Sequence, residues 1–138
     1  MRRSLPHFAI ILLVVGSLLA FLWLVGRDMC NNDIAQEVSS PNGKYKAIIF
    51  ERDCGATTDF STQVSVLKAS KSLSRSDGGN VFVADSNRGV VGTDIKGVMA
   101  VYAHWASNSV LEIHYPSGAR VFEKNDRIGD VTVHYLTD

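Results

Sequence analysis

The sequence lacks the short motifs that identify most enzymes and metal sites. It contains no H-E-x-x-H, no C-x-x-C, no serine in a nucleophile elbow and no glycine loop spaced to hold a phosphate. We therefore assign no catalytic residues and expect no cofactor. The absences leave enzyme activity uncertain and favour a non-enzymatic role.

The chain also lacks a cluster of basic residues. It has 14 Lys and Arg against 14 Asp and Glu. Three of the basic residues precede residue 28, which leaves 11 against 14 and a net charge of −3 for the remainder. This mildly acidic balance argues against nucleic acid or anionic lipid as the main partner.

Apolar residues, by contrast, are concentrated near the N-terminus. From Phe8 to Gly26 the sequence reads FAIILLVVGSLLAFLWLVG, nineteen residues without a charge. As a helix this stretch would span roughly 28 Å, close to the ~30 Å hydrocarbon core of a bilayer. We expect a cytoplasmic tail at 1–7, a transmembrane anchor at 8–26, a juxtamembrane linker at 27–33 and a β-domain at 34–138.

Two other interpretations of this stretch fit less well. A cleaved signal peptide ends in a small-x-small pattern. Here Leu24 stands where a small residue should precede Gly26. A lipid-attachment signal needs small residues before its cysteine, whereas Cys30 follows Arg27, Asp28 and Met29. A retained anchor is the preferred interpretation.

The charges beside the stretch predict its orientation. Arg2 and Arg3 precede it, whereas Arg27 after it is offset by Asp28. The positive-inside rule then leaves the N-terminus in the cytoplasm and exports the rest of the chain. We expect a single-pass protein of a bacterial inner membrane, with a periplasmic C-terminal domain and the lipid bilayer as partner of residues 8–26.

The only two cysteines, Cys30 and Cys54, would then lie in an oxidising compartment, where disulfides persist. We expect them to form a disulfide, which closes a ring of about 25 residues. By lowering the entropy of the unfolded chain, this bond would stabilise the fold by roughly 3.5 kcal/mol. A reactive Cys54 thiol, with Arg52 as its nearest cation, and a metal-bound cysteine are the alternatives.

Short β-type segments bounded by turn residues make up the exported part. In "SSPNG", Pro41 and Gly43 favour a tight hairpin turn. On the strand that follows, Ile48 and Phe50 face away from Ala47 and Ile49, which suggests burial on both sides. We predict a mostly β fold, an antiparallel β-sandwich or barrel-like domain of about eight strands. The segments are 34–38, 44–51, 61–69, 81–85, 98–105, 109–115, 119–124 and 130–136.

One stretch resembles a known group of sequences. "SSPNGKYKAIIFERDCGATTDFSTQVSVL", followed by "GGNVFVAD", is similar to short uncharacterised bacterial proteins with the pattern SPDGKY…RDCGATTxFSTQVS. The chain departs from the pattern at Asn42 and Asp59. The resemblance implies a bacterial, exported or membrane-anchored, β-rich domain with both cysteines as features of the type, and it implies no activity.

Two sets of residues are candidates for function. The first is the loop between the second and third predicted strands, because small, hydroxyl and acidic residues in loops often carry function. It consists of Asp53, Cys54, Gly55, Thr57, Thr58 and Asp59. The second is Glu112, His114 and His134, which could meet as metal ligands if their strands are neighbours. Trp105, just before a turn, is expected to cap the core, with a ligand-stacking platform as the alternative.

Together these observations predict a membrane-anchored envelope protein whose β-domain has a binding or structural role. Its partner would be an envelope protein or another envelope component. The alternative is an enzyme or redox protein that uses Cys54 or the patch formed by Glu112, His114 and His134.

Overall fold

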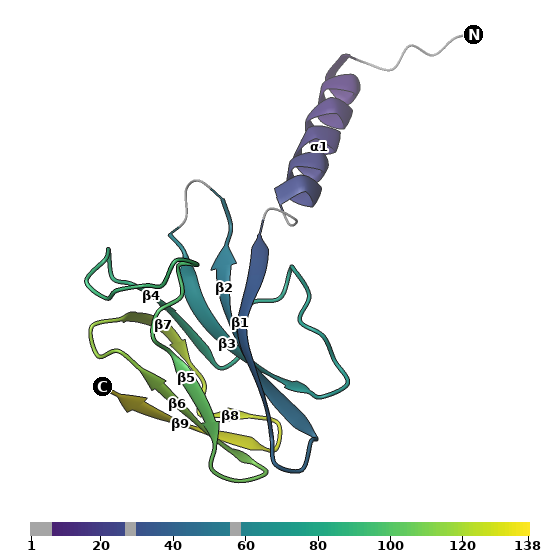
Figure 1. Cartoon of the computed structure of the whole chain (residues 1–138). Helices are drawn as coiled ribbons and strands as arrows, with labels where there is room; N and C mark the ends of the chain where they lie inside the picture. Colours follow the sequence, from purple (N-terminus) through teal and green to yellow (C-terminus); the bar gives the residue numbers. More distant parts are fainter. Residues whose placement is uncertain (1–6, 27–29, 56–58) are drawn as a thin grey trace.

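A computed structural model describes residues 7–26, 30–55 and 59–138 (Figure 1). Within these residues one helix precedes nine strands that form two sheets, which confirms the mostly β fold. The elements are α1 (His7–Gly26), β1 (Asn31–Ser39), β2 (Tyr45–Asp53), β3 (Ser61–Lys68), β4 (Phe82–Asp85), β5 (Tyr102–Trp105), β6 (Val110–Tyr115), β7 (Arg120–Lys124), β8 (Arg127–Ile128) and β9 (Val131–Thr137).

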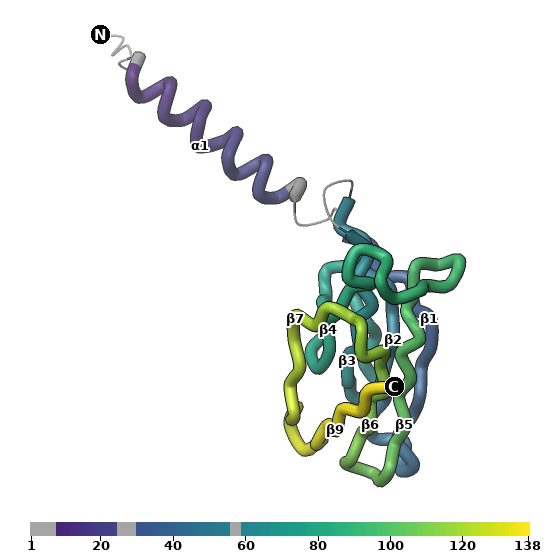
Figure 2. Tube along the Cα trace, turned by 90° about the vertical axis from the view of Figure 1, so that its left-hand side faces the viewer, coloured from purple at the N-terminus to yellow at the C-terminus, as the bar shows by residue number. Residues whose placement is uncertain are grey.

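The helix α1 coincides with the uncharged run of the sequence and projects away from the β-domain (Figures 1 and 2). Its side chains are described from Phe8 to Leu24, and all but Ala9 are exposed. Among the residues described, no helix is both long enough and apolar enough to cross a membrane. The transmembrane anchor at 8–26 therefore stays a prediction.

The larger sheet has the order β1-β2-β3-β4-β7 and is antiparallel throughout. Its first hairpin confirms the turn predicted at "SSPNG": Gly43 has a φ of 67° and donates its N–H to the carbonyl of Ser40 at 2.9 Å. A residue with a Cβ would be strained at that φ. β1 begins at Asn31, inside the segment expected to be a linker.

The smaller sheet has the order β5-β6-β9-β8 and corrects the expectation of an antiparallel domain. β6 and β9 run parallel, with Glu112 opposite His134. The reason is that the last two predicted strands do not pair with each other. β7 pairs with β4 in the larger sheet, whereas β9 joins the smaller sheet beside β6, and the short β8 pairs with β9.

The core lies between the two sheets. Its largest members include Phe82, Leu111 and Ile113, which are fully buried. Trp105 is 6% exposed, which confirms its predicted place in the core, and its indole N–H bonds the Val38 carbonyl at 2.9 Å. This bond links β5 to β1, so it ties one sheet to the other.

A second link between the sheets is made by Tyr135 of β9. Its hydroxyl donates to the carbonyl of Val81 at 2.5 Å or that of Asn125 at 2.9 Å. Burial raises the pKa of Tyr135 to about 12, so the hydroxyl keeps its proton at any physiological pH.

The outer face of β2 is buried as well, as the sequence predicted. Ile48 and Phe50 are at most 1% exposed, yet they lie outside the cluster between the sheets. The segment 70–80 runs over this face, where the Ser65 hydroxyl donates to the Gly78 carbonyl at 3.2 Å. A polar connection therefore acts as a third layer over the larger sheet.

A disulfide joins Cys30 to Cys54, as predicted, with a sequence separation of 24. It extends the pairing of β1 with β2 beyond the last registered pair, Asn31 with Asp53. The bond fixes the start of β1 and the end of β2 to each other at the end of the domain from which α1 leaves (Figure 1).

We expect the double substitution Cys30→Ser and Cys54→Ser to lower the free energy of unfolding by about 3.5 kcal/mol, because the unfolded chain regains the entropy of the closed loop. Urea unfolding of the full chain in detergent, followed by circular dichroism, measures this loss. Reductant should produce the same loss in the unsubstituted chain and none in the double variant. A double variant as stable as the oxidised chain would contradict the prediction.

Candidate functional site

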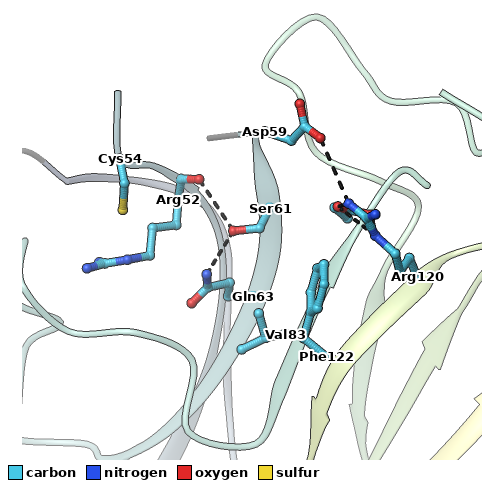
Figure 3. A pocket seen from close by; sticks show the side chains of 9 residues that line it. Arg52, Cys54, Asp59, Ser61, Gln63, Val83, Arg120 and Phe122 are labelled. Carbon is cyan, nitrogen blue, oxygen red and sulfur yellow. Dashed lines mark hydrogen bonds and ion pairs between the residues drawn. The ribbon is translucent and has the colours of Figure 1, made fainter. Parts of the chain in front are cut away.

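A pocket of about 350 Å³ opens on the outer face of the larger sheet, beside the disulfide (Figure 3). Strand alternation places it there: Val64, Phe82 and Ala84 point into the core, so Gln63 and Val83 point outward. The lining residues are Arg52, Cys54, Asp59, Ser61, Gln63, Val83, Asp85, Arg120 and Phe122.

An ion pair between Asp85 and Arg120 forms one wall. The two residues are paired across β4 and β7, and the Arg120 Nε donates to both carboxylate oxygens at 3.1 and 3.2 Å, while its Nη2 donates to Oδ2. The Asp59 carboxylate lies 3.9 Å from the same guanidinium. Figure 3 shows Asp59 and Arg120 facing each other across this ion pair.

Asp85 is only 3% exposed, and its environment changes its pKa. Burial acts to raise the pKa, but hydrogen bonds from Arg120 and from the Asn87 N–H, together with the charges of Arg120 and Arg88, outweigh burial and lower it. A lowered folded-state pKa means that the ionised pair stabilises the fold above the ordinary pKa of aspartate. The stabilisation is lost as pH falls through the folded-state value.

A hydrogen-bonded chain forms the floor of the pocket. The Gln63 side-chain amide donates to the Ser61 hydroxyl at 2.8 Å, and that hydroxyl donates to the Arg52 carbonyl at 3.4 Å. The Gln63 carbonyl oxygen accepts the Gly79 N–H at 2.6 Å. The hydrogen-bonding groups of Ser61 and Gln63 are therefore occupied within the fold. Among the lining residues there is no histidine that could activate Ser61 as a nucleophile.

Arg52 is the structural residue that sequence reasoning missed. One guanidinium nitrogen, Nη1, donates to the side chain of Asn32 at 2.7 Å and to the backbone carbonyls of Arg75 and Asp77 at 3.1 and 2.7 Å. Nη2 donates to the Ser76 carbonyl at 3.3 Å. The arginine thus fastens the serine-rich connection at 70–80, and the only signal of this in the sequence was its outward position on β2.

Phe122 gives the pocket an apolar side. Its ring is 59% exposed, and the Arg120 guanidinium lies over it, 5.1 Å from the centroid. Cations at this distance are attracted to the electron-rich face of an aromatic ring. The pocket therefore combines an exposed aromatic ring with charges that balance: two arginines and two aspartates.

The candidate loop contributes to this site in part. Cys54 and Asp59 line the pocket, and Asp53 accepts the Gly55 N–H at 2.8 Å, which shapes the start of the loop. Thr57 and Thr58 lie outside the described residues. Because the Cys54 sulfur is bonded to Cys30, it is not a free thiol in this structure.

The metal candidates do not form a metal site. β6 and β9 are neighbours, as the hypothesis required, and Glu112 lies opposite His134. His114, however, lies opposite Leu136, and its Nδ1 is 3.9 Å from the Asp138 carboxylate. Across the described part of the chain, no group of three or more His, Cys, Asp or Glu side chains could hold a metal ion.

A second buried carboxylate near the disulfide, that of Glu51, is surrounded by acidic residues, whereas Asp85 is paired with an arginine. Glu51 of β2 is 9% exposed and faces the 94–97 turn, where a Cβ on Gly97 would lie 2.6 Å from its Oε2. Burial, then the charges of Asp33, Asp53 and Asp94, raise the pKa of Glu51. Its ionised form is therefore disfavoured in the folded protein.

No protein-family model, curated protein or solved structure matches this chain.

We expect Glu51→Gln to stabilise the protein at neutral pH. A raised folded-state pKa means that the native state binds the Glu51 proton more readily than the unfolded chain does. The ionised carboxylate therefore costs stability, which returns as pH falls through the folded-state pKa. Thermal unfolding across this range should show a higher Tm for the variant at neutral pH and a smaller rise on acidification.

Asp33→Asn is the graded control for that variant. It removes one of the charges acting on Glu51 while leaving the carboxyl in place, so its effect should have the same sign and be smaller. A neutral-pH Tm for Glu51→Gln that falls below that of the unsubstituted chain would contradict the assignment.

Proposed function

We propose that this protein is a binding domain of the bacterial envelope, held at a membrane by α1 and fastened beside the lipid by its disulfide. The observation that carries the proposal is the bond between Cys30 and Cys54, because Cys30 follows the end of α1 at Gly26 by only four positions. Three residues of intervening chain reach about 10–14 Å when extended. The β-domain would therefore stay close to whatever holds the helix.

The surface of α1 supports placing it in lipid. Its described side chains, Phe8 to Leu24, are apolar or small, and most are exposed around the whole helix. A helix that is apolar on every side needs an apolar surrounding. Exposing its surface to water costs about 25 cal/mol per Å² of apolar area. The uncharged run of the sequence continues to Gly26, beyond the last described side chain, and a helix of 20 residues is roughly 30 Å long.

The disulfide also supports export of the β-domain. Such bonds persist in the periplasm and outside the cell, and are rare in reducing compartments. Arg2 and Arg3 before the helix predict the same orientation. The proposed location is the inner membrane, with the N-terminus in the cytoplasm and residues 28–138 in the periplasm.

The pocket supports binding as the role of the domain. Arg120 is paired with both aspartates, and Arg52 is bonded to the serine-rich connection. The hydroxyl of Ser61 and the amide of Gln63 are bonded within the fold, so the walls are held in place before any ligand arrives. The exposed ring of Phe122 is the part left free for contact. An envelope protein that inserts a neutral, partly apolar segment is the partner this arrangement suits.

A redox role for Cys54 is the second candidate, because its position lines the pocket beside the disulfide. In that role a partner's thiolate would attack one sulfur of the bond, form a mixed disulfide and release the other cysteine as a thiolate. Labelling of periplasmic material with a thiol reagent separates the candidates: a Cys54 that reacts without prior reduction favours the redox role.

Charges placed in the helix test the anchor. We expect the double substitution Leu13→Arg and Leu19→Arg to release the protein from membranes, since a charged side chain at the centre of a span costs about 2.5–3.5 kcal/mol on insertion scales. Fractionation after an alkaline carbonate wash measures the release. Ser107→Arg, in the β5–β6 turn, is the matched control and should stay in the pellet; release of the unsubstituted chain by carbonate would contradict the anchor.

Photo-crosslinking in living cells tests the pocket. A photoreactive amino acid at Phe122 should yield a discrete adduct with an envelope component, whereas the same probe at Leu136 of β9, which is 41% exposed on the other sheet, should not. Arg120→Ala should reduce the Phe122 adduct several-fold because it opens the wall of the pocket. Equal adducts from both positions would contradict a binding role for this pocket.

A further inference from the structure

Exposed apolar side chains gather in two segments of the β-domain that lie next to each other. Phe60 is 55% exposed, Val90 is 69% exposed and Ile95 is fully exposed at 103%. Phe60 and several residues between Ser86 and Gly97 line one hollow, so the two segments are neighbours. We call the set of Phe60, Arg88, Val90, Ile95 and Lys96 the loop-tip surface.

The backbone holds these side chains outward. Asn87 and Arg88 have φ values of 51° and 56°, a left-handed conformation that non-glycine residues adopt at a cost. The Asn87 N–H is bonded to the Asp85 carboxylate at 2.8 Å, which helps to stabilise this conformation. Val91 then packs against the core, and its neighbour Val90 is left facing solvent.

Ile95 is held out by a separate turn. The Gly97 N–H donates to the Asp94 carbonyl at 3.0 Å, and the Lys96 N–H donates to the Asp94 carboxylate at 2.8 Å. These bonds leave Ile95 at the tip of the turn, a position where polar residues are usual. Together with Phe60 and Val90, the fully exposed Ile95 makes a group of exposed apolar side chains, and a group of this kind points to an external apolar partner.

The loop-tip surface lies at the end of the domain nearest to α1. Gly97 packs against Glu51, close to the end of β2 at which Cys54 is bonded to Cys30. Figures 1 and 2 both show the connection between β4 and β5 at the end of the domain from which the helix leaves. An apolar partner common to the helix and to this end of the domain is a lipid bilayer.

The local charge agrees with a lipid surface. Arg88 and Lys96 lie beside the apolar tips, as basic residues do in interfacial contacts, and they offset the neighbouring Asp59 and Asp94. The β-domain as a whole is mildly acidic, so long-range attraction would not bring it to an anionic membrane. The disulfide and the short connection to α1 would do so instead, and the loop-tip surface would then act at short range.

We propose that the loop-tip surface inserts into the interface of the bilayer that holds α1, so that the domain touches the membrane at two places. This inference rests on the proposed function, because it needs α1 in lipid. Contact at a second place restricts rotation of the domain relative to the membrane. It also holds the pocket at a constant height, since Asp59 lines both the pocket and the hollow beside the loop-tip surface.

Depth measurements on the full chain test this contact. The chain is placed in nanodiscs of phosphatidylethanolamine and phosphatidylglycerol that include a lipid with a nitroxide quencher. An environment-sensitive dye is attached in turn to Ile95→Cys, Val90→Cys and Ser107→Cys, the last at the opposite end of the domain. Intact mass without reductant confirms that the native disulfide remains. We expect quenching at Ile95 and Val90 to exceed that at Ser107 several-fold.

Two further measurements separate the contact from the anchor. With the dye at Val90, Ile95→Asp should reduce the quenching several-fold, whereas Ser107→Asp should leave it unchanged. A dye at Leu18→Cys reports on α1. Quenching at Leu18 with Ile95 no more quenched than Ser107 would overturn the lipid contact and leave the anchor standing. No quenching at Leu18 would overturn the anchor, and the contact with it.

Discussion

The bond between Cys30 and Cys54 determines which parts of this molecule lie together. It joins Cys30, just before β1, to Cys54, just after β2, and thereby places the end of α1, the end of β2 and the outer-face pocket at one end of the domain. Without a covalent bond, the start of an edge strand is among the first parts of a sheet to separate. With it, a helix that makes little contact with the domain still has a defined point of attachment.

The larger sheet needs cover on both faces, and the chain provides it in an unusual way. The smaller sheet covers one face, whereas Ile48 and Phe50 on the other are covered by a serine- and glycine-rich connection. A segment without regular structure leaves its backbone carbonyls without partners, and such groups must be bonded when they are near a core. Arg52 supplies the donors, because one guanidinium carries five N–H groups in a fixed plane.

Two carboxylates at the same end of the domain show how partners decide the effect of burial. Asp85 and Glu51 are both nearly inaccessible to water. Asp85 has a guanidinium bonded to it, and its pKa is lowered; Glu51 has three other acids near it, and its pKa is raised. Burial acts to raise the pKa of both carboxyls; the bonded guanidinium reverses that effect for Asp85, whereas the acids near Glu51 add to it. The first acid helps to hold the pocket, and the second weakens the fold at neutral pH.

The sequence alone determined the local features of this protein. The turn at Gly43, the two buried faces of β2, the core position of Trp105 and the pairing of the only two cysteines follow from residues close together or from the absence of alternatives. Tertiary structure decided the rest: β6 lies parallel to β9, Arg52 holds residues 75–77, and Asp85 meets Arg120. It also placed Glu112 opposite His134 but His114 opposite Leu136. Local patterns specify which residues turn, alternate or face inward, because those preferences depend on neighbouring backbone. Strand order and side-chain partners depend on which distant segments pack best, and that is settled only when the whole core forms.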